Sequence, residues 1–309
     1  MAVTTRAWTK RGPLWEPPGS IEWAQSHAAL PALDPIEGDR HWLYFSSRDE
    51  RGRSLLARVE VALGDGTIEV GEFDPEPILE LGELGAFDDS GLTNSWISDD
   101  GDRRLLFYSG WSLGQTVPFY FFAGLAVSED GGRTFRRHTP SPALERDAVD
   151  PYLTASPCVL NEGGRWRMWY VSGTGWEATD GEPVHRYHLK YAESDDGLAW
   201  RREGVVAIDY GSDDEYAISR PCVVRDSDGY RMWFAARGDR YRIGYAESDD
   251  GIDWRRDDAR AGIDPGPEGW DAEMACYPYV HRHREHEYML YNGNGYGATG
   301  IGYAVREVS

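Results

Sequence analysis

Lysine is almost absent from this chain. Only Lys10 and Lys190 occur among 32 basic residues, and 53 acidic residues bring the net charge to −21. Nucleic acids and anionic membranes both favour basic surfaces, so this charge argues against either as the partner. Met1–Arg11 holds no apolar stretch of the signal-peptide type, and no long apolar run follows it. We therefore expect a soluble cytoplasmic protein.

Cysteine is also scarce. The three cysteines, Cys158, Cys222 and Cys276, are too few for a disulfide framework. Cys158 and Cys222 each follow a proline in matching contexts, which predicts a packing role in the core. No close His/Cys spacing indicates zinc, and no glycine-rich phosphate loop indicates a nucleotide. The sequence thus predicts no cofactor and no metal ligands, with one alternative: His27 and nearby carboxylates supporting a calcium ion.

What the chain does contain is an internal repeat. Tyr191–Arg202 and Tyr245–Arg256 are nearly identical, and Leu125–Arg137 is a degraded third copy. A short aromatic run recurs more widely, at residues 41–45, 104–108, 166–170, 230–234 and 287–291. Equivalent positions in these runs are separated by 63, 62, 64 and 57 residues. Repeats of this length are typical of proteins built from repeated supersecondary units.

The repeats predict an all-β fold. Each aromatic run is bounded by Gly, Asp or Asn, which is a strand signal, and each unit has room for four strands. Five four-stranded units around an axis form a five-bladed β-propeller. The last unit stops after its third strand, so Ala7–Arg11 is expected to close the ring, and residues 1–309 to form one domain. Two β-sandwich domains are the alternative, which leaves the five evenly spaced runs unexplained.

The most conspicuous carboxylates belong to turns. Ser194-Asp-Asp-Gly197 and Ser248-Asp-Asp-Gly251, each followed by a tryptophan, resemble the Asp-box turn of propellers. In such turns the Asp side chain binds the turn backbone and Gly accepts a positive φ. We expect these carboxylates to stabilise the outer rim of the fold.

Residues near the axis are the candidates for chemistry. The segments before and within the first strand of each unit differ between units, and they carry acidic groups. Converging carboxylates are what glycosidic cleavage requires, one as acid and one as base or nucleophile. The predicted catalytic residues are Glu273, Asp89 and Asp150. The predicted substrate-binding residues are His27, Arg48, Asp88, Trp111, Trp176, Glu215, Arg220, Arg237, Tyr277 and Asn292.

Two of these predictions concern specific ligand chemistry. Trp111 and Trp176 are expected to stack on a sugar face. Arg220 and Arg237 suit a substrate carboxylate or phosphate, because guanidinium groups bind such groups in a bidentate manner.

Several segments resemble the five-bladed propeller glycosidase superfamily, which includes glycoside hydrolase families 32, 43, 68 and 130. The resemblance is closest to a poorly characterised glycosidase-like branch associated with surface-polysaccharide or sugar-metabolite biosynthesis. The segments are Ser26-His-Ala28, Phe87-Asp-Asp-Ser-Gly91, Ser172-Gly-Thr-Gly-Trp-Glu177, Ile218-Ser-Arg-Pro221, Glu273-Met-Ala-Cys-Tyr-Pro278 and Tyr291-Asn-Gly-Asn-Gly295. The superfamily generally places an essential Asp on the inner strand of the first blade. Here Ser26–Leu30 has no carboxylate.

These features favour a glycosidase-like enzyme that acts on a glycosidic or sugar-derived substrate. A phosphorylase or a non-hydrolytic enzyme (lyase, isomerase or cyclase) on the same scaffold is a second hypothesis, motivated by the missing first-blade Asp. A non-catalytic carbohydrate-binding propeller is the third.

Overall fold

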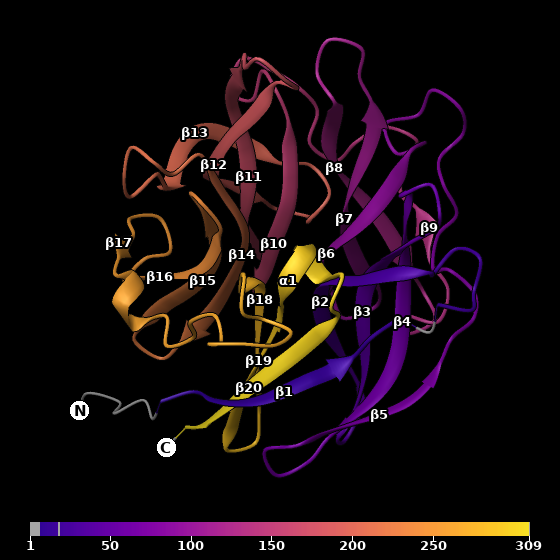
Figure 1. Cartoon of the computed structure of the whole chain (residues 1–309), viewed down its shortest axis with the longest axis vertical. Helices are drawn as coiled ribbons and strands as arrows, with labels where there is room; N and C mark the ends of the chain where they lie inside the picture. The colour runs from indigo at the N-terminus through magenta and orange to yellow at the C-terminus, as the bar shows by residue number, and fades with distance from the viewer. Residues whose placement is uncertain (1–6, 18, 309) are drawn as a thin grey trace.

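The computed structural model describes residues 7–17 and 19–308 (Figure 1). Residues 1–6 lie outside the described residues. They belong to the segment Met1–Arg11, in which the sequence predicts no signal peptide. Across the described residues, every helix falls short of the length and apolar character that crossing a membrane requires.

The fold is almost entirely β, as the repeats predict, and its strands form four hydrogen-bonded sheets. The first contains β2 (Ser26–Glu37), β3 (Arg40–Arg48), β4 (Ser54–Leu63) and β5 (Ile68–Phe73), and the second contains β6 (Gly91–Asp99), β7 (Arg104–Leu113), β8 (Phe119–Ser128) and β9 (Arg136–Arg137). The third, of eight strands, contains β10 (Thr154–Glu162), β11 (Arg165–Glu177), β12 (Val184–Ser194), β13 (Arg201–Ile208), β14 (Ala217–Asp226), β15 (Gly229–Arg237), β16 (Tyr241–Ser248) and β17 (Arg255–Arg256). The fourth contains β18 (Cys276–His283), β19 (His286–Asn292), β20 (Ile301–Glu307) and β1 (Thr9–Trp15), and the short helical turns are η1 (Asp258–Arg260) and α1 (Asn294–Gly297).

The eight-stranded sheet consists of two successive antiparallel meanders. β10–β13 and β14–β17 are joined by one parallel bridge, between Tyr187 and Ala217. The last sheet takes its outer strand from the N-terminal segment, because β1 pairs antiparallel with β20, with Thr9 opposite Val305. The described residues therefore form five antiparallel meanders of four strands each.

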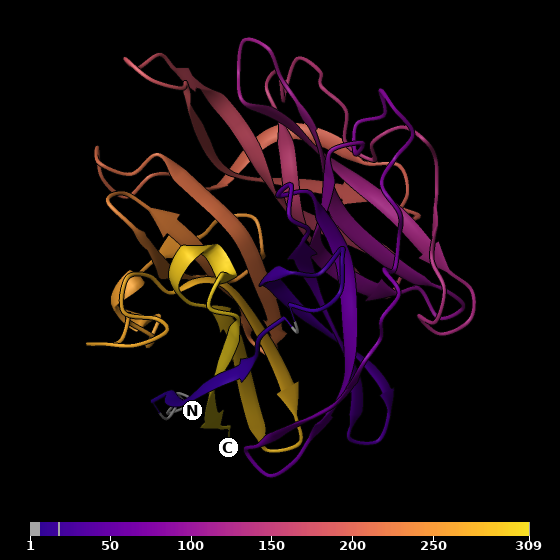
Figure 2. The same cartoon turned by 45° about the vertical axis from the view of Figure 1, so that its right-hand side comes forward.

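The first strands of the meanders lie toward the centre of the molecule, and the last strands lie toward its edge (Figures 1 and 2). β2 contacts β6, β6 contacts β10, β10 contacts β14, β14 contacts β18, and β18 contacts β2. A site at the centre is thus accessible to residues from every meander.

The aromatic runs form the second strand of each meander, as predicted. β3 carries Tyr44 and Phe45, and both are fully buried. Trp169 in β11 and Trp233 in β15 occupy the equivalent position and are also fully buried. Large β-favouring side chains at these positions fill the space between neighbouring sheets.

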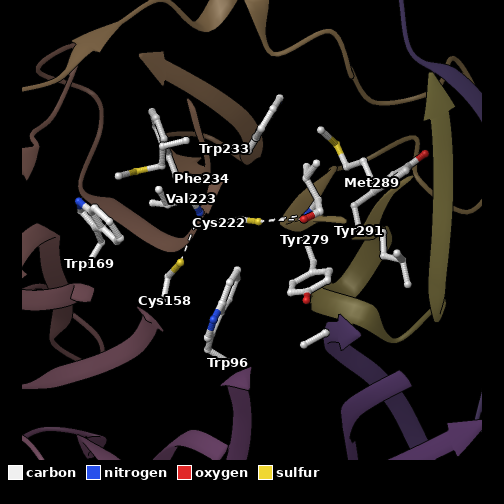
Figure 3. Packing of buried hydrophobic residues seen from close by; sticks show 14 of the residues in the cluster. Trp96, Cys158, Trp169, Cys222, Val223, Trp233, Phe234, Tyr279, Met289 and Tyr291 are labelled. Carbon is white, nitrogen blue, oxygen red and sulfur yellow. Dashed lines mark hydrogen bonds between the residues drawn. The ribbon is translucent and has the colours of Figure 1, made fainter. Parts of the chain in front are cut away.

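The cysteines are core residues, which confirms the packing interpretation (Figure 3). Cys158 Sγ accepts a hydrogen bond from the Val223 amide at 3.3 Å, and Cys222 Sγ accepts one from the Val280 amide at 3.1 Å. Each thiol thereby links its inner strand to the next one around the centre. Complete burial raises the pKa of Cys222 to about 12, which keeps the thiol protonated and unreactive.

The Asp-box turns have the structural role that the sequence predicts. Asp196 Oδ1 accepts hydrogen bonds from the amides of Leu198 and Ala199 at 2.8 and 2.9 Å. Gly197 has φ +72°, a left-handed conformation that glycine adopts without a steric penalty. In the next copy, the Gly251 carbonyl accepts a 2.9 Å hydrogen bond from Trp169 Nε1 of the preceding meander. The turns therefore connect neighbouring meanders at the rim.

A second repeated element is a buried carboxylate that joins three parts of one meander. Three aspartates each accept a hydrogen bond of 2.8–2.9 Å from the hydroxyl of a tyrosine on a second strand. In each case the aspartate lies 20 residues before the tyrosine in the sequence. Each also pairs with a cation on a fourth strand. The three sets are Asp88 with Tyr108 and Arg137, Asp150 with Tyr170 and Arg202, and Asp271 with Tyr291 and Lys10. We call this arrangement the carboxylate staple.

The staple corrects the predicted roles of three residues. Asp150 is fully buried and also accepts hydrogen bonds from Ser172 Oγ and Lys190 Nζ. Asp88 is 1% exposed. Glu215 takes the same place in the fourth meander, where it pairs with Arg256 at 2.6 Å. Each of these carboxylates is held by protein donors and none lines the cavity described below, so their observed contacts are structural.

Removal of a staple should destabilise the protein. In Asp150→Ala, Arg202, Lys190 and Tyr170 lose their shared acceptor in a buried environment, and such losses cost about 3–5 kcal/mol. Urea unfolding followed by tryptophan fluorescence should show a fall of that size in the free energy of unfolding. Asp195→Ala is the matched control, because Asp195 also pairs with an arginine but its side chain is 83% exposed. Similar, small effects in both variants would contradict the staple.

Candidate functional site

The centre of the molecule is shaped by prolines in the inner strands. Leu30, Ser156, Arg220 and Tyr277 each precede a proline and each has a left-handed φ between +44° and +57°. Each also lies at a register shift between the first and second strands of its meander. Proline has no amide hydrogen for the ladder, so pairing is interrupted and the strand bulges. A bulge redirects side chains. Leu30, Ser156 and Tyr277 face a central cavity, whereas Arg220 does not line it.

The cavity has a volume of about 430 Å³ and lies among the N-terminal halves of the inner strands. All five meanders contribute to its wall. Its aromatic residues are Trp111, Phe119, Phe121, Tyr187, Tyr241, Tyr277 and Tyr296, and its charged or titratable nitrogen groups are His27, Arg48, His185 and Arg237. None of the described residues that line it is an aspartate or glutamate.

Two arginines give the cavity its charge. Arg48 ends β3 and Arg237 ends β15, and both are half-buried. Among the described residues, neither guanidinium forms an ion pair with a carboxylate. Arg237 instead lies 5.2–5.4 Å from the ring centres of Tyr216, Tyr241 and Tyr296, which is cation–π distance. The cavity therefore presents two positive groups whose hydrogen-bonding capacity is available to an anion.

A histidine accompanies each arginine. Burial, followed by the charge of Arg48, lowers the pKa of His27 to about 4. Burial, followed by the charge of Arg237, lowers the pKa of His185 to about 4. His185 stacks on Tyr187 with ring centres 4.8 Å apart, and its buried Nε2 has no hydrogen-bond partner among the described residues. Both imidazoles are therefore neutral at pH 7.

Five predicted substrate-binding residues line the cavity: His27, Arg48, Trp111, Arg237 and Tyr277. Two others support the wall from behind. Trp176 packs against Phe119 and His185, with ring centres 5.2 and 5.9 Å away. Asn292 is fully buried, donates to the carbonyl of Ala28 at 2.6 Å, and accepts from the Leu30 amide at 2.8 Å. It thereby holds the inner strand that carries His27.

Arg220 has a different place from the one predicted. Its side chain is fully buried outside the cavity wall, and Nη2 donates to the carbonyl of Pro31 at 2.6 Å. Burial lowers its pKa to about 10. This arginine therefore links the fourth meander to the first without lining the cavity, and its role in substrate binding stays a prediction.

The other predicted catalytic carboxylates do not converge on the cavity. Glu273 is exposed, and its amide donates to Asn294 Oδ1 at 2.8 Å. The next residue, Met274, packs against a buried cluster that contains the cavity residue Tyr241, so Glu273 lies in a loop beside the site. Asp89 accepts hydrogen bonds from the Gly85 amide and Ser90 Oγ at 2.9 and 2.8 Å. It lies two residues before Gly91, which contacts Trp111.

The sequence indicates His185 and Tyr187 only as part of a rim loop in the third unit, and it does not single out the cavity residues Phe119, Phe121, Tyr241 and Tyr296. His185 and Tyr187 alternate on β12, so both side chains face the same side of the strand. Tyr296 occupies α1, where it has φ +59°. The only signal for these residues was their position in loops and strand ends that differ between repeats.

Solved structures with similar folds are glycoside hydrolases. The chain aligns with a structure described as a glycoside hydrolase at a TM-score of 0.73 and 17% identity, covering 98% of this chain and 92% of that one. A thermostable family-43 glycoside hydrolase aligns at 0.66 and 15%, covering 96% and 92%. A sucrose-6-phosphate hydrolase from Lactobacillus gasseri aligns at 0.59 and 13%, covering 92% and 60%. These likenesses confirm the predicted resemblance to propeller glycosidases at the level of the fold.

Closer relatives come from mycobacteria. The chain is 45% identical over 302 residues to an uncharacterized protein of Mycobacterium tuberculosis, Rv1502 in strain ATCC 25618 / H37Rv and MT1551 in strain CDC 1551 / Oshkosh. The match covers 97% of this chain and 99% of the relative. The chain belongs to the same family as this mycobacterial protein. No protein-family model matches it.

The lowered pKa of His185 makes stability dependent on pH. Unfolding returns this group from a pKa of about 4 to about 6.5, so the unfolded state binds more protons between these values. The free energy of unfolding should therefore fall as pH decreases from 6.5 to 4, and the slope should be smaller in His185→Gln. Replacement of the exposed His138 by Gln is the control. Equal slopes in all three proteins would contradict a buried neutral His185.

Proposed function

We propose that this protein is a glycosidase-like enzyme that acts on an anionic sugar or sugar-derived substrate in the central cavity. The observation that carries the proposal is the pair of arginines, Arg48 and Arg237, in an aromatic cavity whose described lining contains no carboxylate. Guanidinium groups suit carboxylate and phosphate, and aromatic rings suit the apolar face of a sugar.

The arrangement of the fold supports this interpretation. We take the five meanders as five blades of a propeller, with β1 completing the last blade beside β20. Inner strands that contact one another in a cycle leave the cavity on the axis, where equivalent positions from all blades converge. The glycoside hydrolase neighbours share this fold, and the substrate that one of them is named for, sucrose 6-phosphate, is an anionic sugar.

The two imidazoles are the proposed proton-transfer groups. Ordinary glycosidases use a pair of carboxylates for this purpose, and the described lining offers His27 and His185 instead. One protonated imidazole would donate its proton to the leaving oxygen of the glycosidic bond. The other, neutral, would accept a proton from the water that attacks the anomeric carbon.

An anionic substrate would switch the protonation of these groups. The charge of Arg237 contributes to the low pKa of His185, after burial, and Arg48 does the same for His27. A bound carboxylate or phosphate beside the arginines offsets that charge and so raises the imidazole pKa, whereas the larger effect of burial is unchanged. The acid would thus become available only when the correct substrate is bound.

The assignment predicted from the sequence, with Glu273 as the acid and Asp89 as the base or nucleophile, stays the alternative to the imidazoles. Both lie in loops next to residues that line the cavity, and neither is committed to a carboxylate staple. Glu273 is the more accessible of the two, because its side chain is exposed.

The anion site can be tested by binding. Calorimetric titration with paired ligands, galacturonate against galactose and glucuronate against glucose, should show preference for the uronate. Arg237→Gln or Arg48→Gln should reduce uronate affinity by about 10- to 100-fold, since each removes a charge-assisted hydrogen bond. Arg242→Gln, an exposed arginine outside the cavity, is the control. Equal affinity for uronates and neutral sugars in the wild type would remove the anion site.

The proton-transfer roles can be separated by turnover. With an aryl glycoside of a uronic acid, His185→Gln should lower kcat by about 10²- to 10⁴-fold. Glu273→Gln is measured in parallel. If its decrease in kcat is larger than that of His185→Gln, the acid is the Glu273 carboxylate and not the imidazole. Turnover that requires phosphate would indicate phosphorolysis, and uronate binding without turnover over a broad glycoside panel would indicate a binding propeller. Either result would overturn hydrolysis.

A further inference from the structure

Three histidines meet at the end of the molecule remote from the cavity. His281 and His283 alternate on β18, so their side chains lie on one side of the strand. His41 is the second residue of β3 in the first meander. The His41 ring centre lies 5.0 Å from that of His281 and 5.3 Å from that of His283. One ring nitrogen from each histidine falls within 4.8 Å of the others.

The position is distinct from the proposed active site. Tyr277 lines the cavity near the start of β18, and His281 follows four residues later, about 13 Å along the strand. None of the three histidines belongs to the cavity wall. The cluster joins the sheet β2–β5 to the sheet that contains β18–β20 and β1, which are the first and last meanders of the chain.

Asp39 orients two of the imidazoles. His41 Nδ1 lies 2.9 Å from the Asp39 carbonyl oxygen, and His283 Nε2 lies 2.8 Å from Asp39 Oδ1. Both oxygens only accept, so these nitrogens carry the hydrogens. The opposite nitrogens, His41 Nε2 and His283 Nδ1, are left with free lone pairs. Metal-binding histidines are typically held in this way by a carbonyl or carboxylate on the second nitrogen.

We propose that His41, His281 and His283 form a zinc-binding site that ties the first meander to the last. Three imidazoles suit a borderline divalent ion such as Zn²⁺, which takes four ligands in a tetrahedral arrangement. Water supplies the fourth position, because the Asp39 carboxylate is held by His283 Nε2 and by Arg284 Nη2. His283 has a side chain that is 14% exposed, and it provides the route by which the ion enters.

This site changes one interpretation made from the sequence. His281 and His283 alternate with arginines in a hairpin, a pattern that indicates surface residues and not a metal site. The third histidine is 240 positions earlier in the chain than His281, so no local spacing reveals it. The fold alone brings the first and last meanders together.

The test is zinc binding by the purified full-length protein after removal of metal with a chelator. Competition against a chromophoric chelator should show one tight equivalent of zinc, and cobalt should give the intense visible bands of tetrahedral coordination. Zinc at 100 times its Kd should raise Tm by about 5 °C. His281→Gln and His283→Gln should each reduce zinc affinity by at least about 100-fold and abolish the cobalt bands.

His286→Gln is the matched control, because His286 lies in the same hairpin but faces Asp65, with Nε2 3.5 Å from Oδ1. Its zinc affinity should equal that of the wild type. His283→Gln keeps the test decisive if the more buried His281 variant fails to fold. Absence of a stoichiometric zinc complex in the wild type, or unchanged affinity in His283→Gln, would overturn the proposal.

Discussion

The interrupted pairing of the inner strands is the constraint on which the site depends. In four first strands a proline lies at the register shift, where it offers no amide donor to the ladder, and the residue before it has a left-handed conformation. Three of these residues, Leu30, Ser156 and Tyr277, then form part of the cavity wall. The fourth, Arg220, lies below the wall and bonds across the centre to Pro31. A regular, fully paired inner strand would direct these side chains differently.

The sequence predicts the framework well because the framework repeats. Aromatic second strands, Asp-box turns and the matching Cys158 and Cys222 recur at similar spacing, and each has a local physical cause in strand or turn chemistry. Asp88, Asp150 and Asp271 show the limit of that reasoning. Their flanking residues differ between repeats, yet each lies 20 residues before a tyrosine that it binds. A search for constant Asp-to-Tyr spacing would have identified the staple.

The site was less predictable, because its residues are defined by the absence of a repeat. His27, Arg48, Trp111, Arg237 and Tyr277 could be selected from their positions at strand ends. Tyr296 could not, since its approach to the cavity depends on the course of α1, and His185 was indicated only as part of a rim loop in the third unit. The same reason hid the histidine cluster, whose members come from opposite ends of the chain. Contacts between distant segments leave no pattern in local sequence.

Charge is distributed in a way that net charge does not reveal. The chain carries a net charge of −21, yet the wall of its central cavity contains two arginines and two neutral histidines. Many of the buried carboxylates are occupied in staples and ion pairs, whereas Arg48 and Arg237 have no described carboxylate partner. A substrate anion would supply that partner, and binding and protonation would then be coupled. Calorimetric titration of a uronate at pH 6, in buffers of different ionisation enthalpy, measures this coupling directly. We predict net proton uptake on binding that disappears in Arg237→Gln, and binding with no proton uptake in the wild type would contradict the coupling between the anion and the imidazoles.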